Sequence, residues 1–246
     1  MSIILVTGTG TGVGKTTVAA AVAALAHDSG LRVAYLKLAQ TGTDAGDSDV
    51  AEIARLTPLS ASAVGQLASY PEPLAPATAA RRSGLPPLEL DETLHALRAL
   101  DRDHELVVAE GAGGLLVQFD DLDGWTLADV AEELDAQVLV AAASGLGTLN
   151  HTALTAEALR RRDLDPIGVV IGAWPAAPGL ADRCNLEDFA STDIGDLVGA
   201  LPAGLGASDR GTFLEQAAAG LAPLLGGTFD AADFIRRNAP EPKAAE

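Results

Sequence analysis

The feature that most constrains the fold of this chain is a glycine- and threonine-rich stretch at residues 8–17, GTGTGVGKTT. It follows an apolar run at residues 3–6 and leads into the alanine- and valine-rich residues 18–25. This order predicts a strand, a turn and a helix. A turn with four glycines before Lys15 can aim successive backbone N–H groups into a concavity, and the positive end of the following helix dipole adds to it. The stretch therefore predicts a phosphate-binding loop.

Two side chains of this loop suit a nucleoside triphosphate. Lys15 would neutralise the outer phosphates, and the hydroxyl of Thr16 would bind a magnesium ion. The strict phosphate-loop pattern places its first glycine at position 9, where this chain has Thr9, and the glycine is Gly8 instead. The alternative is a turn without a ligand, which the strand and helix on either side of the loop disfavour.

Composition narrows the function further. The chain has 246 residues and a formal net charge of −18 at pH 7, and 48% of its residues are hydrophobic. This length and apolar content suit one α/β domain with a full core. The negative charge argues against nucleic acid and anionic membranes as partners, because its long-range field repels them. No basic leader precedes the first apolar run, and no run approaches the roughly 20 apolar residues that span a bilayer, so we expect a cytoplasmic protein.

Three further charged residues are candidates for the same site. Lys37 ends the apolar run at residues 31–37, Glu110 ends the run at residues 105–110, and Asp49 follows a polar loop. Because the carboxyl ends of parallel strands meet at one edge of a sheet, we expect these residues near the phosphate loop. The alternatives are a solvent-facing strand end for Lys37, an exposed acid for Glu110 and a helix cap for Asp49. Lysines are only three in number, and glycines follow Glu110 directly, which favours functional roles for both.

The remaining expected elements follow from apolar periodicity. Strands are expected at residues 115–119, 137–142, 166–171 and 196–201, and helices at residues 50–56, 88–100, 126–133, 153–162 and 211–225. Residues 57–88 are rich in proline, serine and alanine and are interpreted as an irregular connection and a candidate wall of the substrate pocket. The glycine turn at residues 145–152 is either a carboxylate-binding helix start or an ordinary helix cap.

Five segments, taken in order, resemble the dethiobiotin synthetases. They are the variant phosphate loop at residues 8–17, a Lys-x-x-x-Thr-Gly segment at residues 37–42, Asp49, a Glu-Gly-Ala-Gly-Gly segment at residues 110–114 and a Gly-x-x-Asn-His segment at residues 147–151. The likeness runs from residue 3 to about residue 204. Members of the family often have a proline after the lysine of the second segment, where this chain has Leu38.

The resemblance implies a single P-loop NTPase domain of the α/β class, with a mostly parallel sheet flanked by helices on both faces. We expect this domain at residues 1–225, and a C-terminal extension at residues 226–246 that is partly helical and then frayed. The resemblance also implies a ligase in which 7,8-diaminononanoate takes up CO2 or bicarbonate as a carbamate. The carbamate oxygen attacks the γ-phosphate, and the second amine closes the ureido ring of dethiobiotin, with release of ADP and phosphate. Cations must hold the carbamate and the triphosphate in line, and Lys15, Lys37 and Mg²⁺ would supply them.

The same resemblance implies roles for individual residues. The catalytic residues would be Lys15, Lys37 and Thr41, and the magnesium ligands would be Thr16, Asp49 and Glu110. The nucleotide would bind to Gly12, Val13, Gly14, Lys15, Thr16, Thr17, Asp49, Glu110, Gly111, Ala112, Gly113, Gly172, Ala173, Pro202, Ala203 and Gly204. The diamine would bind to Thr11, Lys37 and Thr41 and, across the interface of a homodimer, to Gly147, Thr148, Leu149 and Asn150. Ala173 and Trp174 stand where the family typically reads adenine with an asparagine, so we expect ATP or another nucleoside triphosphate as co-substrate.

A second function class shares these motifs in part. Partitioning-type P-loop ATPases use a similar nucleotide site to switch a protein partner and perform no small-molecule chemistry. They carry a lysine five residues before the position of Lys15, and this chain has Gly10 there. The sequence therefore favours the ligase over the switch.

Overall fold

Seven parallel strands form the centre of the fold in the computed structural model, which describes residues 3–46, 48–191 and 195–240. The strands are β1 (Ile3–Gly8), β2 (Val33–Thr41), β3 (Val64–Tyr70), β4 (Leu106–Glu110), β5 (Gln137–Ala142), β6 (Pro166–Trp174) and β7 (Leu197–Pro202). Their order in the sheet is β3-β2-β4-β1-β5-β6-β7, and each neighbouring pair is parallel. Parallel strands covered on both faces consist of nearly continuous apolar runs, as in β1, where every residue is buried.

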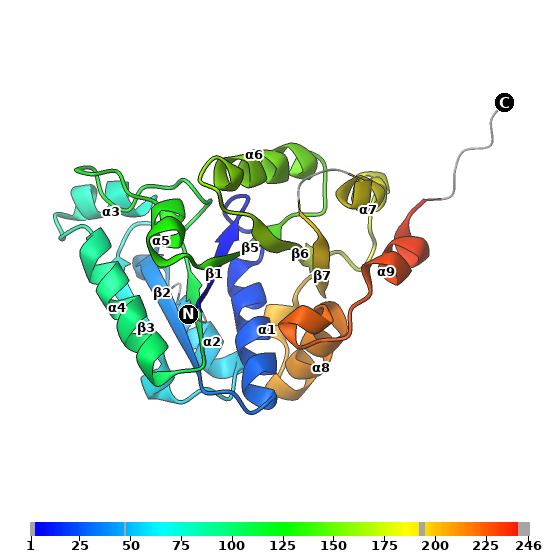
Figure 1. Ribbon diagram of the computed structural model, residues 1–246, viewed down its shortest axis with the longest axis horizontal. Coiled ribbons are helices and arrows are strands. Elements are labelled where there is room, and N and C mark those ends of the chain that lie inside the picture. The colour runs from blue at the N-terminus through cyan, green and yellow to red at the C-terminus, as the bar shows by residue number, and fades with distance from the viewer. Residues whose placement is uncertain (1–2, 47, 192–194, 241–246) are drawn as a thin grey trace.

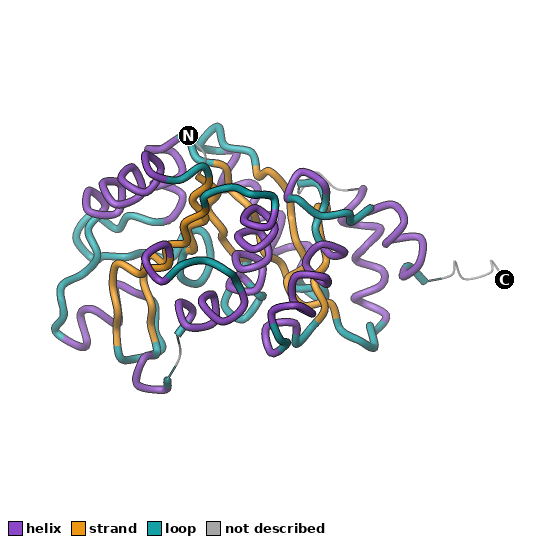
Figure 2. Tube along the Cα trace, turned by 90° about the horizontal axis from the view of Figure 1, so that it is seen from below, coloured by secondary structure: helices purple, strands orange, loops and turns teal. Residues whose placement is uncertain are grey.

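Helices cover both faces of this sheet (Figures 1 and 2). The α-helices of the described residues are α1 (Lys15–Asp28), α2 (Asp49–Leu56), α3 (Pro76–Ser83), α4 (Leu90–Asp103), α5 (Leu127–Leu134), α6 (Thr148–Arg160), α7 (Leu180–Ser191), α8 (Arg210–Gly220) and α9 (Ala231–Asn238). Short 3-10 helices are η1 (Thr43–Ala45), η2 (Ala61–Ala63), η3 (Leu205–Ala207) and η4 (Pro223–Leu225). Buried side chains of α1, α2 and α8 form one apolar cluster, and those of α3 to α7 form the other.

The strand order places a ligand-binding edge at the middle of the sheet. β1 lies between β4 and β5: the chain leaves β1 toward β2 on one side, and it leaves β4 toward β5 on the other side. In open α/β sheets, ligands bind beyond the carboxyl ends of the strands at such a reversal. The phosphate loop follows β1 at this edge, and Glu110 ends the neighbouring strand β4. The expected sheet with helices on both faces is thus confirmed.

Two parts of the sequence prediction are wrong. Residues 115–119 were expected as a strand, but they form a turn in which the N–H of Val117 donates to the carbonyl of Gly114 over 3.2 Å. Both edges of β4 are already paired with β1 and β2, so the short apolar run finds no free edge beside β4. Its Phe119 packs against Trp125 instead, with ring centroids 4.4 Å apart. The supposed irregular connection at residues 57–88 contains β3 and α3.

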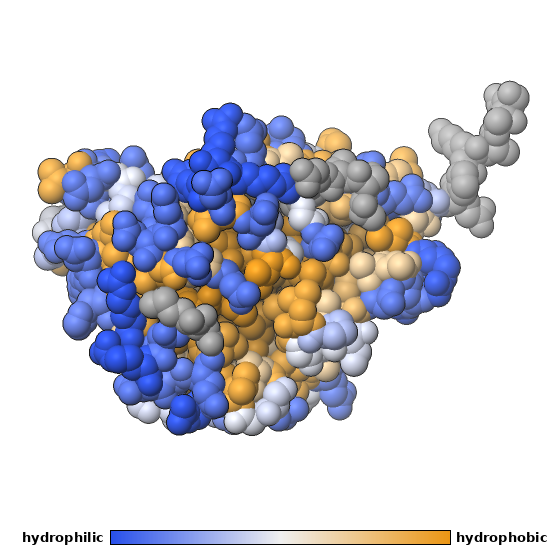
Figure 3. All heavy atoms as spheres, in the orientation of Figure 1, coloured by the Kyte–Doolittle hydropathy of each residue, from blue (hydrophilic) through white to orange (hydrophobic). Residues whose placement is uncertain are grey.

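The C-terminal part is helical at α9, whose Phe234 packs edge-on against Trp174 with ring centroids 5.2 Å apart. The expected fraying falls mainly on residues 241–246, which lie outside the described residues, and the domain boundary at residue 225 stays a prediction. In the orientation of Figure 1, the surface is apolar in the middle and hydrophilic around most of its edge (Figure 3). Of the described helices, none combines the length and the apolar character needed to cross a membrane.

Candidate active site

The phosphate loop is packed against the end of β6. Gly14 is the N-cap of α1 and has a left-handed φ of 89°, a conformation that favours glycine. A Cβ at Gly14 would lie 2.5 Å from the carbonyl oxygen of Gly172, and a Cβ at Gly172 would lie 2.1 Å from the carbonyl oxygen of Val13. Glycines at both positions therefore let two backbone segments meet without side chains, and this contact holds the loop at the amino end of α1.

Lys15 lies buried beneath this loop, and its Nζ donates to the carbonyl oxygen of Gly10 over 2.8 Å. Burial lowers the pKa of Lys15; Glu110 opposes this shift, and Lys37 adds to it. Among the described residues, no carboxylate lies within ion-pair distance of Lys15. The loop therefore presents a cation whose charge is held by one backbone carbonyl, an arrangement that an incoming phosphate would improve.

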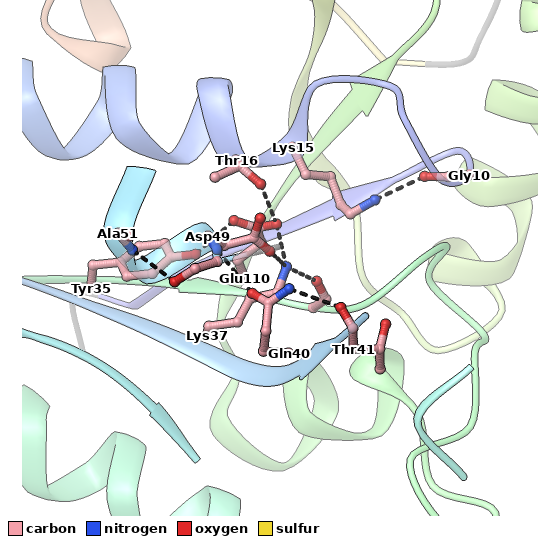
Figure 4. A network of polar contacts seen from close by, with 12 residues as sticks. Gly10, Lys15, Thr16, Tyr35, Lys37, Gln40, Thr41, Asp49, Ala51 and Glu110 are labelled. Carbon is pink, nitrogen blue, oxygen red and sulfur yellow. Dashed lines mark hydrogen bonds and ion pairs between the residues drawn. The ribbon is translucent and has the colours of Figure 1, made fainter. Parts of the chain in front are cut away.

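A buried ion-pair network lies next to Lys15 (Figure 4). The Nζ of Lys37 lies 2.5 Å from Oε1 of Glu110 and 2.6 Å from Oδ2 of Asp49. It also donates to the carbonyl oxygen of Gly111 over 3.1 Å. Burial works against the charge on Lys37, but Glu110 and Asp49 outweigh it and raise the pKa of Lys37. The lysine therefore stays protonated at neutral pH. It lies in the middle of β2, opposite Glu110 at the carboxyl end of β4, so the expectation that Lys37 ends its strand is wrong.

Two side chains that the sequence prediction missed complete the network. The hydroxyl of Tyr35 donates to Oε2 of Glu110 over 2.8 Å, and burial, followed by the Glu110 charge, raises the pKa of Tyr35 well above its usual value. The Oε1 of Gln40 accepts from the backbone N–H of Asp49 over 2.9 Å. Tyr35 precedes Lys37 by two residues on β2, and this period-2 spacing was the available signal for its placement on the same face. Gln40 had no comparable signal.

Asp49 is the first residue of α2 and does not cap it. The N-cap is Ser48, whose hydroxyl accepts from the backbone N–H of Ala51. The carboxylate of Asp49 is therefore available for Lys37. Of the two interpretations that the sequence left open for Asp49, the helix cap is wrong.

A cavity of about 720 Å³ surrounds these groups. Predicted site residues on its wall are Thr11, Gly12, Gly14, Lys15, Thr16, Thr17, Lys37, Thr41, Asp49, Glu110, Ala112 and Gly113. Pro73, Leu74 and Ala75, which follow β3, and Pro76, the first residue of α3, also line it, so part of residues 57–88 forms a wall of this cavity. That this wall contacts the substrate stays a prediction. The cavity therefore brings the predicted phosphate-binding residues together with both lysines and both acids.

Other predicted residues lie outside this cavity. Gly172 contacts the phosphate loop at Val13 and Gly14. The N–H of Ala203 donates to the carbonyl oxygen of Trp174 over 2.7 Å, so the ends of β6 and β7 are adjacent. The four predicted tail-binding residues, Gly147, Thr148, Leu149 and Asn150, start α6. The hydroxyl of Thr148 donates to the carbonyl oxygen of Ala143 over 2.6 Å. No described contact joins the start of α6 to the cavity of the same chain.

The oxygen donors in this cavity fit a magnesium ion. The hydroxyl of Thr16 lies 3.0 Å from Oε1 of Glu110, and Asp49 reaches the same lysine as Glu110. Among the described residues, no group of three or more His, Cys, Asp or Glu side chains could hold a metal ion. Mg²⁺ is usually bound by one or two carboxylates together with substrate phosphates and needs no such protein cage. The donor set is therefore of the right chemical type, with hard oxygens beside a phosphate loop.

Comparisons with known proteins agree with these motifs. A family model described as an AAA domain matches residues 2–205. The ATP-dependent dethiobiotin synthetase of Saccharopolyspora erythraea is 60% identical over 190 residues, which cover 76% of this chain and 81% of that protein. The ATP-dependent dethiobiotin synthetase of Streptomyces avermitilis is 55% identical over 243 residues, which cover 98% of this chain and 100% of that protein.

Solved structures show the same fold at low sequence identity. The MinC:MinD cell division protein complex of Aquifex aeolicus has a TM-score of 0.56 and 12% identity, and covers 94% of this chain and 98% of that chain. FtsY from Mycoplasma mycoides has a TM-score of 0.52 and 16% identity, and covers 96% of this chain and 66% of that chain. These likenesses show the P-loop NTPase fold alone. Together with its five motifs, the identity to curated synthetases over nearly its whole length shows that this chain belongs to the dethiobiotin synthetase family.

Proposed function

We propose that this protein is an ATP-dependent ligase that forms the ureido ring of dethiobiotin from 7,8-diaminononanoate and CO2. The observation that carries the proposal is Lys37, which is held between Glu110 and Asp49 beside the phosphate loop and Lys15. The names of the relatives support the same reaction. A partitioning-type switch is not favoured, because Gly10 replaces its lysine and the curated relatives are synthetases.

The reaction needs no nucleophile from the protein. One amine of the substrate adds to CO2 and loses a proton, which gives a carbamate. A carbamate oxygen attacks the γ-phosphorus, the bond to ADP breaks, and a carbamic–phosphoric anhydride results. The second amine then attacks the carbonyl carbon and expels phosphate, which carries away the carbamate oxygen. The main task of the site is therefore to hold two anions in line and to stabilise the charge that is transferred.

The lysines are suited to this task. Lys15 would exchange the carbonyl oxygen of Gly10 for the outer phosphates, because a charged acceptor makes the stronger hydrogen bond. Lys37, protonated and shared by two carboxylates, would face the γ-phosphate and the carbamate. Thr41 and Thr11 line the same cavity and would hydrogen-bond the carbamate or its amine. The backbone N–H groups of residues 12–17 would cradle the phosphates.

Thr16, Asp49 and Glu110 would hold Mg²⁺ in the loaded enzyme. The metal ion supplies charge neutralisation at the phosphate oxygens. Because Glu110 and Asp49 also bind Lys37, these two carboxylates position the lysine as well as the metal. Residues 111–113 follow Glu110 directly, and a Cβ at Gly111 would lie 2.8 Å from the side chain of Leu127, so this turn admits little bulk.

We place the base of the nucleotide at Gly172, Ala173 and residues 202–204, where the ends of β6 and β7 are adjacent. Backbone groups dominate this region, so ATP is the expected co-substrate and other nucleoside triphosphates are candidates. Residues 147–150 would bind the tail carboxylate of the diamine held by a second copy of the chain in a cytoplasmic homodimer. Gly147 and Asn150 are exposed at the amino end of α6, and none of the four residues lines the cavity of its own chain, which supports this arrangement.

A product assay tests the proposal. Purified protein is incubated with diamine, bicarbonate, Mg²⁺ and each nucleoside triphosphate, and the cyclic urea is identified by mass. We expect dethiobiotin with ATP, and none with Lys37→Ala, which should still bind nucleotide. Full turnover by Lys37→Ala would remove Lys37 from the site. The absence of product with every triphosphate would refute the ligase assignment.

A further inference from the structure

Glu52 is an acid that the proposed reaction does not use, although it lines the active-site cavity. It lies on α2, one turn after Asp49, and it also lines a neighbouring depression of about 450 Å³ together with Ala51, Arg55, Gly206 and Ala207. The carboxylate therefore stands where the triphosphate cavity meets the depression beside η3.

The side chain of Glu52 lies beside Gly206, near the phosphate loop. A Cβ at Gly206 would lie 2.5 Å from Oε1 of Glu52 and 3.5 Å from Oγ1 of Thr17, so both side chains occupy the space beside this glycine. Thr17 directly follows the lysine and threonine of the phosphate loop. Glu52 thus lies between the phosphate loop and the segment that continues from residues 202–204, the proposed base-binding end of β7.

Among the described residues, the carboxylate of Glu52 has no hydrogen-bond donor and no ion-pair partner, although it is half-buried. Burial raises the pKa of Glu52, Asp49 raises it further, and Arg55 partly opposes the shift. A half-buried acceptor without a donor costs stability, and a ligand that supplies one removes this cost. The position therefore suits a ligand with hydroxyl or amino hydrogens.

Two arginines fasten the helix that carries this acid, and in the described part of the chain neither forms a hydrogen bond or ion pair with Glu52. Arg55 donates through Nη1 to the carbonyl oxygen of Ser208 over 2.7 Å, and through Nη2 to the carbonyl oxygen of Gly206. Arg210, at the start of α8, donates to the carbonyl oxygens of Ala54 and Arg55 over 3.1 and 3.3 Å. These bonds fasten α2 to η3 and α8 in both directions. Both guanidinium groups thus donate to backbone carbonyl oxygens, and the carboxylate of Glu52 stays available to accept a hydrogen bond from a ligand.

We propose that Glu52 accepts a hydrogen bond from a ribose hydroxyl of the bound nucleotide and so makes the enzyme selective for ribonucleotides. This inference rests on the proposed nucleotide site. The triphosphate has no hydrogen to donate at neutral pH and is repelled by a carboxylate, whereas the sugar between phosphates and base carries two neighbouring hydroxyls. A carboxylate with two acceptor oxygens matches that pair.

The test measures dissociation constants of ATP, 2′-deoxyATP and 3′-deoxyATP in the presence of Mg²⁺, for the full-length wild type and for Glu52→Gln and Glu52→Ala. A hydrogen bond to a charged acceptor is worth about tenfold or more in affinity. We expect the wild type to bind ATP at least tenfold more tightly than one of the deoxynucleotides. Glu52→Gln should narrow this ratio, and Glu52→Ala should bring it close to one. Glu215→Gln, on the exposed face of α8, is the matched control and should keep the wild-type ratio.

Three outcomes would overturn the inference. In the first, the wild type binds all three nucleotides with equal affinity. In the second, Glu52→Ala keeps the wild-type ratio of ATP to deoxynucleotide affinity. In the third, Glu52→Ala lowers the affinity for all three nucleotides equally and raises the magnesium concentration that binding needs, as expected if Glu52 supported the metal. Because binding is measured without turnover, these results are independent of the product assay. A missing cyclic urea with intact ribose selectivity would refute the ligase and leave the role of Glu52 standing.

Discussion

Lys37→Met should destabilise the protein before any substrate is bound. The substitution keeps an unbranched side chain of similar length but removes the cation that Glu110 and Asp49 share. Glu110 is fully buried, so its carboxylate would be left with the hydroxyls of Tyr35 and Thr16 and with the nearby charge of Asp49. A buried charge that loses its partner is one of the few changes that cost a domain much of its stability.

The size of the effect follows from the geometry. At an effective dielectric constant of about 20, two unit charges at the 2.5 Å that separates Lys37 and Glu110 attract each other with about 6–7 kcal/mol. Desolvation of both ions cancels part of this attraction, and removal of one partner of a buried pair costs about 3–5 kcal/mol. For a chain of this length, that loss corresponds to a fall of about 10 °C in melting temperature. Lys37→Met combined with Glu110→Gln should be more stable than Lys37→Met alone, because the amide still accepts from Tyr35 and carries no charge.

Urea unfolding at neutral pH, without nucleotide or magnesium, measures this effect as a shift of the midpoint at constant slope. The matched control is Lys15→Met in the same cavity. Lys15 has one carbonyl partner, and burial lowers its pKa, so its removal should change the free energy of unfolding by no more than about 1 kcal/mol. The reasoning is refuted if Lys37→Met lowers the free energy of unfolding by less than about 1 kcal/mol. It is also refuted if the loss in the double variant equals the sum of the losses caused by Lys37→Met and by Glu110→Gln alone.

Three further predictions concern pH, packing and metal. The pKa of Lys37 is raised on folding, so its ion pairs stabilise the fold fully at pH values below the unfolded lysine pKa of about 10.4. This contribution is lost as the pH rises through the higher folded value. Urea midpoints measured from about pH 8 to 11.5 should therefore fall more steeply for the wild type than for Lys37→Met. Gly172→Ala forces a Cβ against the carbonyl of Val13 and should cost about 3 kcal/mol in urea unfolding and weaken nucleotide binding, whereas Gly10→Ala, with open space around it, should cost under about 1 kcal/mol. Glu110→Gln should raise the magnesium concentration for half-maximal turnover at least about tenfold, and an unchanged titration would remove Glu110 from the metal site.

The parts of the site that were predictable from the sequence have a strong local signal. Lys15 follows a glycine turn and Glu110 ends a strand, and the topology of a parallel sheet brings such positions to one edge. Lys37 was predicted at a strand end but lies within β2, and its pairing opposite Glu110 brings it to the site. Glu52 was not predictable, because its place depends on contacts between α2 and η3, which lie about 150 residues apart in the chain. Tyr35 was missed because a buried aromatic residue in a strand is ordinarily a core residue.

The fold shows the same division. Central strands with continuous apolar runs were predicted, whereas the edge strand β3 was missed, since only one of its edges is paired and most of its residues are half-buried or exposed. The last core helix was expected at residues 211–225 but ends at Gly220, because Pro223 cannot continue a helix and starts η4 instead. Local pattern thus predicted the strands with buried apolar runs, including the edge strand β7, whereas the more exposed edge strand β3 escaped it.

The central claim is that this site transfers a phosphoryl group to a carbamate oxygen. It is tested most directly by one turnover with diamine, Mg²⁺, ATP and freshly dissolved ¹⁸O-labelled bicarbonate in unlabelled water, followed by mass analysis of the released phosphate. We expect phosphate that carries one ¹⁸O atom for each dethiobiotin formed, because the carbamate oxygen leaves with phosphorus. Unlabelled phosphate formed together with dethiobiotin would contradict the mechanism, because the γ-phosphorus would then have been attacked by water and not by the carbamate oxygen.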